Sequence, residues 1–81
     1  MKKVWLIQER VFAYGKYFES KIGDIEIYAR KKSAIKALNH IKEFAVKSDY
    51  KVVAENEIFF CYTDEDGWTF SFRIFEKSVF L

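Results

Sequence analysis

Apolar residues recur every three or four positions in the middle of the chain. This spacing places them on one side of a helix and leaves charged residues on the other side. Ser33 is a favourable residue to cap the start of such a helix, and Glu43 stands four residues before Lys47 in the stabilising order. The pattern predicts an amphipathic helix over about residues 33–47, with a buried face formed by Ala34, Ala37, Leu38, Ile41, Phe44 and Ala45.

The other periodic segments are typical of β-strands. VWLIQ near the N-terminus is rich in β-forming residues, and IEIYA at residues 25–29 alternates its aliphatic side chains with Glu26 and Tyr28. After the helix, YKVVAE, EIFFCYT and GWTFSFRIF follow in close succession, and the last alternates between apolar and polar positions. Residues 11–22 are compatible with a continuation of the first strand, a separate strand or a loop.

The order of these elements predicts an α+β fold with the succession strand, strand, helix, strand, strand, strand. One helix would pack on one face of a mostly antiparallel sheet of four to five strands. We expect a single domain over residues 1–81, because two domains would each be too small to support a core. The terminal SVFL, apolar to its last residue, is expected to be an edge strand or a contact.

The acidic stretch DEDG between two aromatic strands is a turn whose length decides which side chains share a face. A two-residue loop at Asp66-Gly67 would place Phe59 with Phe70, whereas a three-residue loop starting at Glu65 would place Phe60 with Phe70. The longer loop buries more apolar surface, and Asp first with Gly fourth suits a type I turn, so we predict this register. It directs Phe59, Cys61, Ser71, Arg73 and Phe75 to the other face of the sheet.

One helix cannot cover both faces of a sheet of this width. A helix covers a strip about 10 Å wide, whereas four or five strands span roughly 20 Å. Three aromatic residues, Phe59, Phe75 and Tyr28, are expected on the uncovered face beside Arg73. The cover could be the 11–22 segment, a second copy of the chain in a homodimer, or another macromolecule.

Composition indicates the cellular environment of the protein and the distribution of its charge. One cysteine, Cys61, excludes an intramolecular disulfide and favours a reducing, cytoplasmic environment. No apolar run approaches the 18 or so residues that span a bilayer, so no membrane association is expected. The net charge of +2 conceals an uneven distribution, because residues 30–51 carry seven Lys or Arg against two Asp or Glu, and residues 52–81 carry two against six.

Catalytic chemistry has little support in the sequence. The single histidine, His40, falls on the charged side of the predicted helix, and Cys61 lies in a strand without a basic neighbour to activate it. Asp64 and Asp66 lack the further ligands of a calcium loop, because Arg73 stands where the bidentate glutamate would be. We therefore predict no enzyme activity, no bound metal and no cofactor.

Two kinds of macromolecular binding remain. We predict a protein-binding domain that uses the sheet face with Phe59, Arg73, Phe75 and Tyr28, as an inhibitor or adaptor of the kind that phages and mobile elements direct at host proteins. The alternative is nucleic-acid binding, in which the aromatic and arginine face stacks bases and the basic start of the helix contacts phosphates. The basic residues of that alternative are Arg30, Lys31, Lys32 and Lys36.

Overall fold

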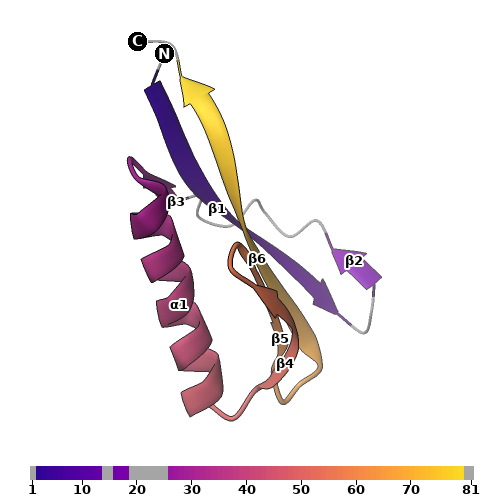
Figure 1. The fold of residues 1–81 in the computed structure, drawn as a ribbon. Helices are drawn as coiled ribbons and strands as arrows, with labels where there is room; N and C mark the ends of the chain where they lie inside the picture. Colours follow the sequence, from indigo (N-terminus) through magenta and orange to yellow (C-terminus); the bar gives the residue numbers. More distant parts are fainter. Residues whose placement is uncertain (1, 14–15, 19–25, 80–81) are drawn as a thin grey trace.

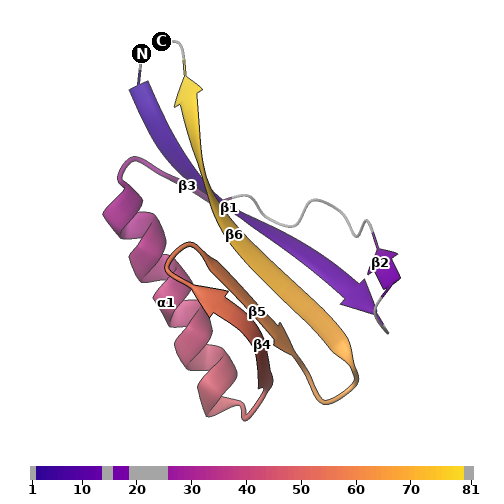
Figure 2. The same ribbon diagram turned by 45° about the vertical axis from the view of Figure 1, so that its right-hand side comes forward.

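The computed structural model describes residues 2–13, 16–18 and 26–79. Figures 1 and 2 show a helix lying along one side of a long, twisted antiparallel sheet. In chain order the elements are β1 (Lys2–Ala13), β2 (Lys16–Phe18), β3 (Glu26–Tyr28), α1 (Lys31–Lys47), β4 (Lys51–Asn56), β5 (Phe59–Thr63) and β6 (Trp68–Val79).

The sheet has the strand order β2-β1-β6-β5-β4, and β3 pairs with the same edge of β1 as β2. This arrangement confirms the predicted α+β class with one helix on one face of an antiparallel sheet. The described residues contain six strands because β2 forms within the 11–22 segment, and residues 11–13 continue β1. The remaining residues of that segment lie outside the described ranges.

Strand β6 occupies the middle of the sheet, between β1 and β5. It pairs with β1 over twelve positions, from Ala13 opposite Trp68 to Lys2 opposite Val79. The SVFL segment was expected to be an edge strand or a contact, and its described residues Ser78 and Val79 do lie at an edge, because they pair with β1 alone and β5 pairs with β6 only from Thr69 to Arg73. Phe80 and Leu81 lie outside the described residues.

Helix α1 begins at Lys31, two residues before the predicted start. Arg30 is extended and occupies the N-cap position without a side-chain cap, and the backbone N–H of Ser33 donates to the Arg30 carbonyl at 3.1 Å. The predicted capping role of Ser33 is therefore wrong, because the helix follows directly on β3. At the other end Asp49 adopts a positive φ of 60°, and Tyr50 N–H closes the helix on the Ala45 carbonyl at 3.0 Å.

The core lies between α1 and the sheet face formed by alternate residues of β1, β5 and β6. Ala34, Leu38 and Ala45 on the helix are fully buried, as is Phe60 on β5. The small alanines let the helix approach the aromatic residues of the sheet closely. Buried or half-buried residues of the sheet side include Ile7, Tyr62, Phe70, Phe72 and Ile74.

The acidic turn has the predicted three-residue loop. Asp64 N–H donates to the Trp68 carbonyl at 2.9 Å, and Gly67 has a φ of 86°, which only glycine adopts at little cost. The Asp64 carboxylate accepts the backbone N–H groups of Asp66 and Trp68 at 2.9 and 3.0 Å. The register that follows places Phe60 opposite Phe72 and Phe59 opposite Arg73, as predicted. Trp68, at the end of the turn, is not buried as Phe60 is and remains 39% exposed.

Candidate functional site

The face of the sheet that points away from α1 is the outer face, formed by the outward residues of β1, β5 and β6. Phe59, Arg73 and Gln8 form one row across it, because Arg73 pairs with Phe59 on one side and with Gln8 on the other. Phe75 pairs with Leu6 in the next row. The register thus brings three of the four residues predicted for protein binding, Phe59, Arg73 and Phe75, onto one face.

Arg73 and Phe59 are in direct contact on the outer face. The guanidinium carbon lies 5.1 Å from the centre of the Phe59 ring, within the range of a cation–π interaction. Phe59 is half-buried under this contact, whereas Phe75 remains 39% exposed. A hollow of about 290 Å³ lies among these side chains and is lined by Gln8, Arg10, Phe59, Ser71, Arg73 and Phe75.

A second hollow of about 320 Å³ continues along the same face and is lined by Leu6, Gln8, Phe75, Glu76 and Lys77. The two hollows share Gln8 and Phe75, so the Phe75 ring separates two recesses. Glu76 reaches the second recess from a position opposite Trp5, and its carboxylate is paired with Lys3 at 3.0 Å. Phe75 therefore stands between two shallow depressions into which a partner's side chains could fit.

Every charged residue at an outward position of the described parts of β1, β5 and β6 is basic. Arg10 and Arg73 flank the first recess, and Lys77 flanks the second. The acidic residues of the 52–81 region lie in the turns or at strand positions that point away from the outer face. Although the protein as a whole is nearly neutral, the outer face combines exposed aromatic surface with positive charge.

Cys61 also points to the outer face, opposite Ser71, but it is only 8% exposed. Its thiol is free, and burial raises the pKa of the thiol above its ordinary value of 9.0. A raised pKa makes the nucleophilic thiolate scarcer near neutral pH. Cys61 thus contributes packing to the outer face and has no activating neighbour in these contacts.

Tyr28 does not join the outer face. It pairs with Trp5 and packs against the core beside α1, and its hydroxyl donates to the Glu26 carboxylate. Burial, followed by the hydrogen bond to Glu26 and the charge of that carboxylate, raises the pKa of Tyr28 to about 12. The predicted orientation of this strand is wrong, because the ring of Tyr28 packs inward and Ile27 is left 67% exposed.

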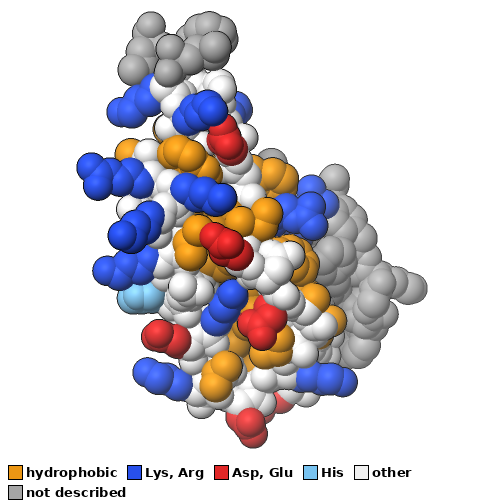
Figure 3. Space-filling model, viewed as in Figure 1, with side chains coloured by type: hydrophobic (Ala, Val, Ile, Leu, Met, Phe, Trp, Pro, Cys, Tyr) orange, Lys and Arg blue, Asp and Glu red, His pale blue; other side chains and the backbone are white. Residues whose placement is uncertain are grey.

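The basic helix start lies on the opposite side of the sheet from the outer face. Arg30, Lys31, Lys32 and Lys36 are all exposed, and Figure 3 shows Lys and Arg side chains gathered on the side formed by α1. A shallow hollow of about 450 Å³ lies among Arg30, Lys32, Ser33, Ile35, Lys36 and Asn39. The two parts of the predicted nucleic-acid site therefore do not form one continuous surface.

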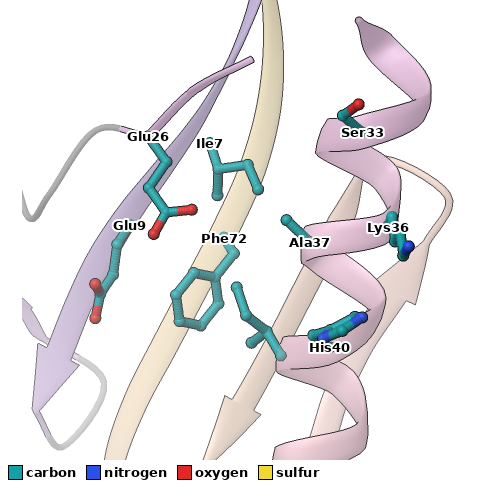
Figure 4. A pocket seen from close by; sticks show the side chains of 9 residues that line it. Ile7, Glu9, Glu26, Ser33, Lys36, Ala37, His40 and Phe72 are labelled. Carbon is teal, nitrogen blue, oxygen red and sulfur yellow. The ribbon is translucent and has the colours of Figure 1, made fainter.

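A groove between α1 and β1 was not predicted. Lys42 links the helix to β4 and β5, because its ammonium donates to the Asn56 carbonyl at 3.0 Å and lies 6.0 Å from the Phe60 ring centre. Part of the sheet face beside β1 is left as a groove of about 550 Å³ (Figure 4). It is lined by Ile7, Glu9, Glu26, Ser33, Lys36, Ala37, His40, Ile41 and Phe72.

The sequence could not reveal this groove because the residues that line it come from four separate elements. Glu9 and Glu26 reach it from neighbouring strands, and Lys36 and His40 reach it from the helix. His40, predicted to be a solvated residue, is exposed at its rim. Among the residues that the structure describes, no cluster of three His, Cys, Asp or Glu residues is arranged to hold a metal ion.

Comparison with known proteins adds no assignment: no family model, curated protein sequence or solved structure matches this chain. Within the described ranges, no helix combines the length and the apolar character needed to cross a membrane. The function therefore has to be argued from the surfaces of the protein itself.

Proposed function

We propose that the protein is a small non-catalytic protein-binding domain that docks an acidic partner on its outer face. The observation that carries the proposal is the pair of recesses around Phe75, bordered by Arg10, Arg73 and Lys77. Exposed aromatic and arginine side chains are the residues that most often dominate binding energy at protein interfaces. A partner that inserts apolar side chains beside Phe75 and presents carboxylates to the arginines would complement this face.

The proposal agrees with the other properties of the chain. The free thiol of Cys61 is consistent with a reducing, cytoplasmic environment. An inhibitor or adaptor of a host protein needs a binding surface and no catalytic group. A homodimer through the outer face is disfavoured, because a two-fold contact would bring two positively charged faces together. Sedimentation at tens of micromolar should accordingly give the mass of one chain.

Capture from a lysate of the source cells tests the docking face. The outer-face variant carries Arg73→Glu with Phe75→Ser, and a matched control carries Lys36→Glu with Val46→Ser on the helix side. A partner of the outer face should be captured by the wild type and the control variant and lost by the outer-face variant. Purified partner and wild-type protein should then form a complex whose affinity falls at high salt. Retention of every captured protein by the outer-face variant would overturn the proposal.

Nucleic-acid binding is the second candidate, favoured by the absence of acidic residues from the outward positions of the described parts of β1, β5 and β6. A single strand could stack bases on Phe75 and on the Arg73–Phe59 pair while Arg10 and Lys77 contact phosphates. Mobility-shift assays with single-stranded DNA and RNA should then show binding that weakens steeply between low and moderate salt. Absence of a shift at both salt concentrations would eliminate this candidate and leave protein binding.

A further inference from the structure

We propose that the acidic partner of the outer face binds as an extended strand that pairs with the free edge of β6. This edge is the side of residues 75–79 that faces away from β1. The partner strand would direct every second side chain onto the outer face, beside Phe75 and Lys77. The inference rests on the function proposed above, because it specifies how the partner of that face is held.

Strand β5 covers only the first part of β6. The pairing ends at Phe59 opposite Arg73, and the last hydrogen bond runs from the Ile74 N–H to the Ile58 carbonyl at 2.9 Å. Beyond this point β6 pairs only with β1 among the described strands, and the two strands extend together past β5 (Figures 1 and 2). Residues 75–79 therefore have one paired side and one open side.

The open side presents the backbone groups that a further strand needs. Alternate residues of a strand direct their N–H and C=O groups to opposite sides, so Glu76 and Ser78 follow Ile74 in pointing these groups away from β1. Within the described ranges, these groups of Glu76 and Ser78 have no backbone partner. The pairing of β6 with β1 continues to Val79 without a register shift, so the open side is a regular row of donors and acceptors.

A second edge of the sheet, formed by β4, is less suited to strand addition. Its pairing with β5 shifts register between Val52 and Ala54, which marks a β-bulge. A bulge twists an edge strand and interrupts the row of backbone groups that a partner strand would use. The regular edge of β6 is therefore the better site for a partner strand.

The charges along the free edge favour a different chain over a second copy of this one. An antiparallel pair of two copies centred on this segment places either Glu76 opposite Glu76 or Lys77 opposite Lys77, and like charges in opposite positions are destabilising. Glu76 is already paired with Lys3 at 3.0 Å, whereas Lys77 has no ion-pair partner among the described residues. A partner strand with a carboxylate opposite Lys77 and an apolar residue opposite Phe75 complements this edge.

The probe for this site is the capped peptide acetyl-Val-Thr-Glu-Thr-Val-amide. Paired antiparallel to β6, as the other strands of the described sheet are, it places its glutamate opposite Lys77 and its last valine opposite Phe75. Nuclear magnetic resonance titration of the isotope-labelled protein should shift the backbone amides of Glu76, Lys77 and Ser78. The shifts should saturate at peptide concentrations on the order of 1 mM, because a few net hydrogen bonds supply little affinity.

Two methylated forms of the peptide test the backbone pairing. Methylation of the backbone nitrogen of the second threonine removes the N–H that would donate to the Glu76 carbonyl, and it should weaken binding at least about tenfold. Methylation of the backbone nitrogen of the glutamate is the matched control, because this N–H points away from β6. The control peptide should bind within about twofold of the unmethylated probe.

Charge reversal tests the position of the partner's acidic residue. Lys77→Glu should weaken binding of the probe about two- to fivefold, and a peptide with lysine in place of the glutamate should recover this loss. Lys51→Glu, at an exposed position of the β4 edge, is the matched control and should leave the affinity unchanged. Equal weakening by the two variants would mean that only the net charge of the protein matters and would overturn the assigned position.

The strand pairing is wrong if no amide shifts, if the shifts lie on β4, or if the two methylated peptides bind equally. These outcomes are separate from the capture experiment on the outer face. A captured outer-face partner together with equal binding of the methylated peptides would uphold docking and refute the strand pairing. Binding of the probe with the expected methylation pattern, but without an outer-face partner in the capture, would uphold the β6 edge as a peptide site and refute docking alone.

Discussion

The two faces of the sheet use aromatic residues of the same strands in opposite ways. On the helix side, Phe60 is fully buried, and Tyr62 stacks on Tyr50 and Phe70 with ring centres 5.5 and 5.1 Å apart. On the outer face, one position away along β5 or β6, Phe59 lies under the Arg73 guanidinium and Phe75 is 39% exposed. A shift of one position along a strand separates residues that hold the fold together from residues available to a partner.

This difference shows that aromatic content alone does not measure the core of a small domain. A fifth of the residues are aromatic, yet among the aromatic side chains whose burial the structure describes only Phe60, Tyr62 and Phe72 are buried. The other aromatic residues with a described side chain border the core, end a turn or face outward. Stability and binding should therefore respond to different substitutions, and the following measurements compare the faces in order of decreasing expected effect.

The largest contrast is expected between Phe60→Ala and Phe75→Ala. Removing the buried Phe60 ring leaves a cavity under the helix and should lower the free energy of unfolding by about 3–5 kcal/mol. Removing the exposed Phe75 ring should lower it by about 1 kcal/mol or less. Urea denaturation of both variants measures the two values, and equal losses would mean that the outer face is also part of the core.

The turn that sets the register should respond next. Asp64→Ala removes the acceptor of two backbone N–H groups and should cost about 1–2 kcal/mol of unfolding free energy. Glu65→Ala, at an exposed position in the same loop, is the control and should change stability by less than about 0.5 kcal/mol. If the two variants unfold at the same urea concentration, the carboxylate of Asp64 does not hold the turn.

Cys61 reports on the packing of the outer face. Because its thiol is buried and its pKa is raised, reaction with an aromatic disulfide reagent should be at least about tenfold slower in the native protein than in urea. The rate should increase as the pH rises through and beyond 9.0, the ordinary value for the thiol. Equal rates in the native and unfolded states would show that the outer face opens freely at this position.

The charge on the outer face should matter little for folding. Arg73→Glu reverses an exposed charge and loses one cation–π contact, so the free energy of unfolding should change by about 1 kcal/mol or less. The same substitution should abolish docking of an acidic partner. A stability loss as large as that of Phe60→Ala would indicate that Arg73 has a structural role.

A high-pH titration checks the placement of Tyr28 on the helix side. Its pKa is raised from 10.0 to about 12, so its contribution to stability is complete below pH 10 and is lost as the pH rises through 12. Phenolate absorbance of the wild type should exceed that of Tyr28→Phe only near pH 12. A difference that develops fully near pH 10 would mean that Tyr28 is exposed, as the strand pattern predicts.

Much of the fold could be predicted because local and long-range signals agree. The helix has a clear apolar stripe, and Asp64 and Gly67 specify the turn whose length determines the faces of Phe59, Arg73 and Phe75. Those three residues were consequently placed correctly on the face opposite the helix. The α+β class followed from the order of the elements alone.

The errors lie where short segments depend on distant partners. Strand β3 has three residues, and its orientation is decided by packing of Tyr28 beside Trp5 and the helix, which overrides the alternation of its aliphatic residues. The groove is formed by α1 together with β1, β3 and β6, which are far apart in the sequence. Neither arrangement leaves a periodic signal in the sequence.

The central position of β6 has a consequence for how the protein is made. The β1–β2–β3 part and the β4–β5 part of the sheet meet only through β6, which leaves the ribosome after all of them. Until residues 68–79 emerge, the nascent chain has two half-sheets and no strand to join them. Closure then requires contacts across almost the whole chain, such as Lys2 with Val79, and contacts of this range slow folding. Completion of the sheet is therefore expected to wait until residues 68–79 have emerged, and the edges of β1 and β5 that pair with β6 stay exposed until then.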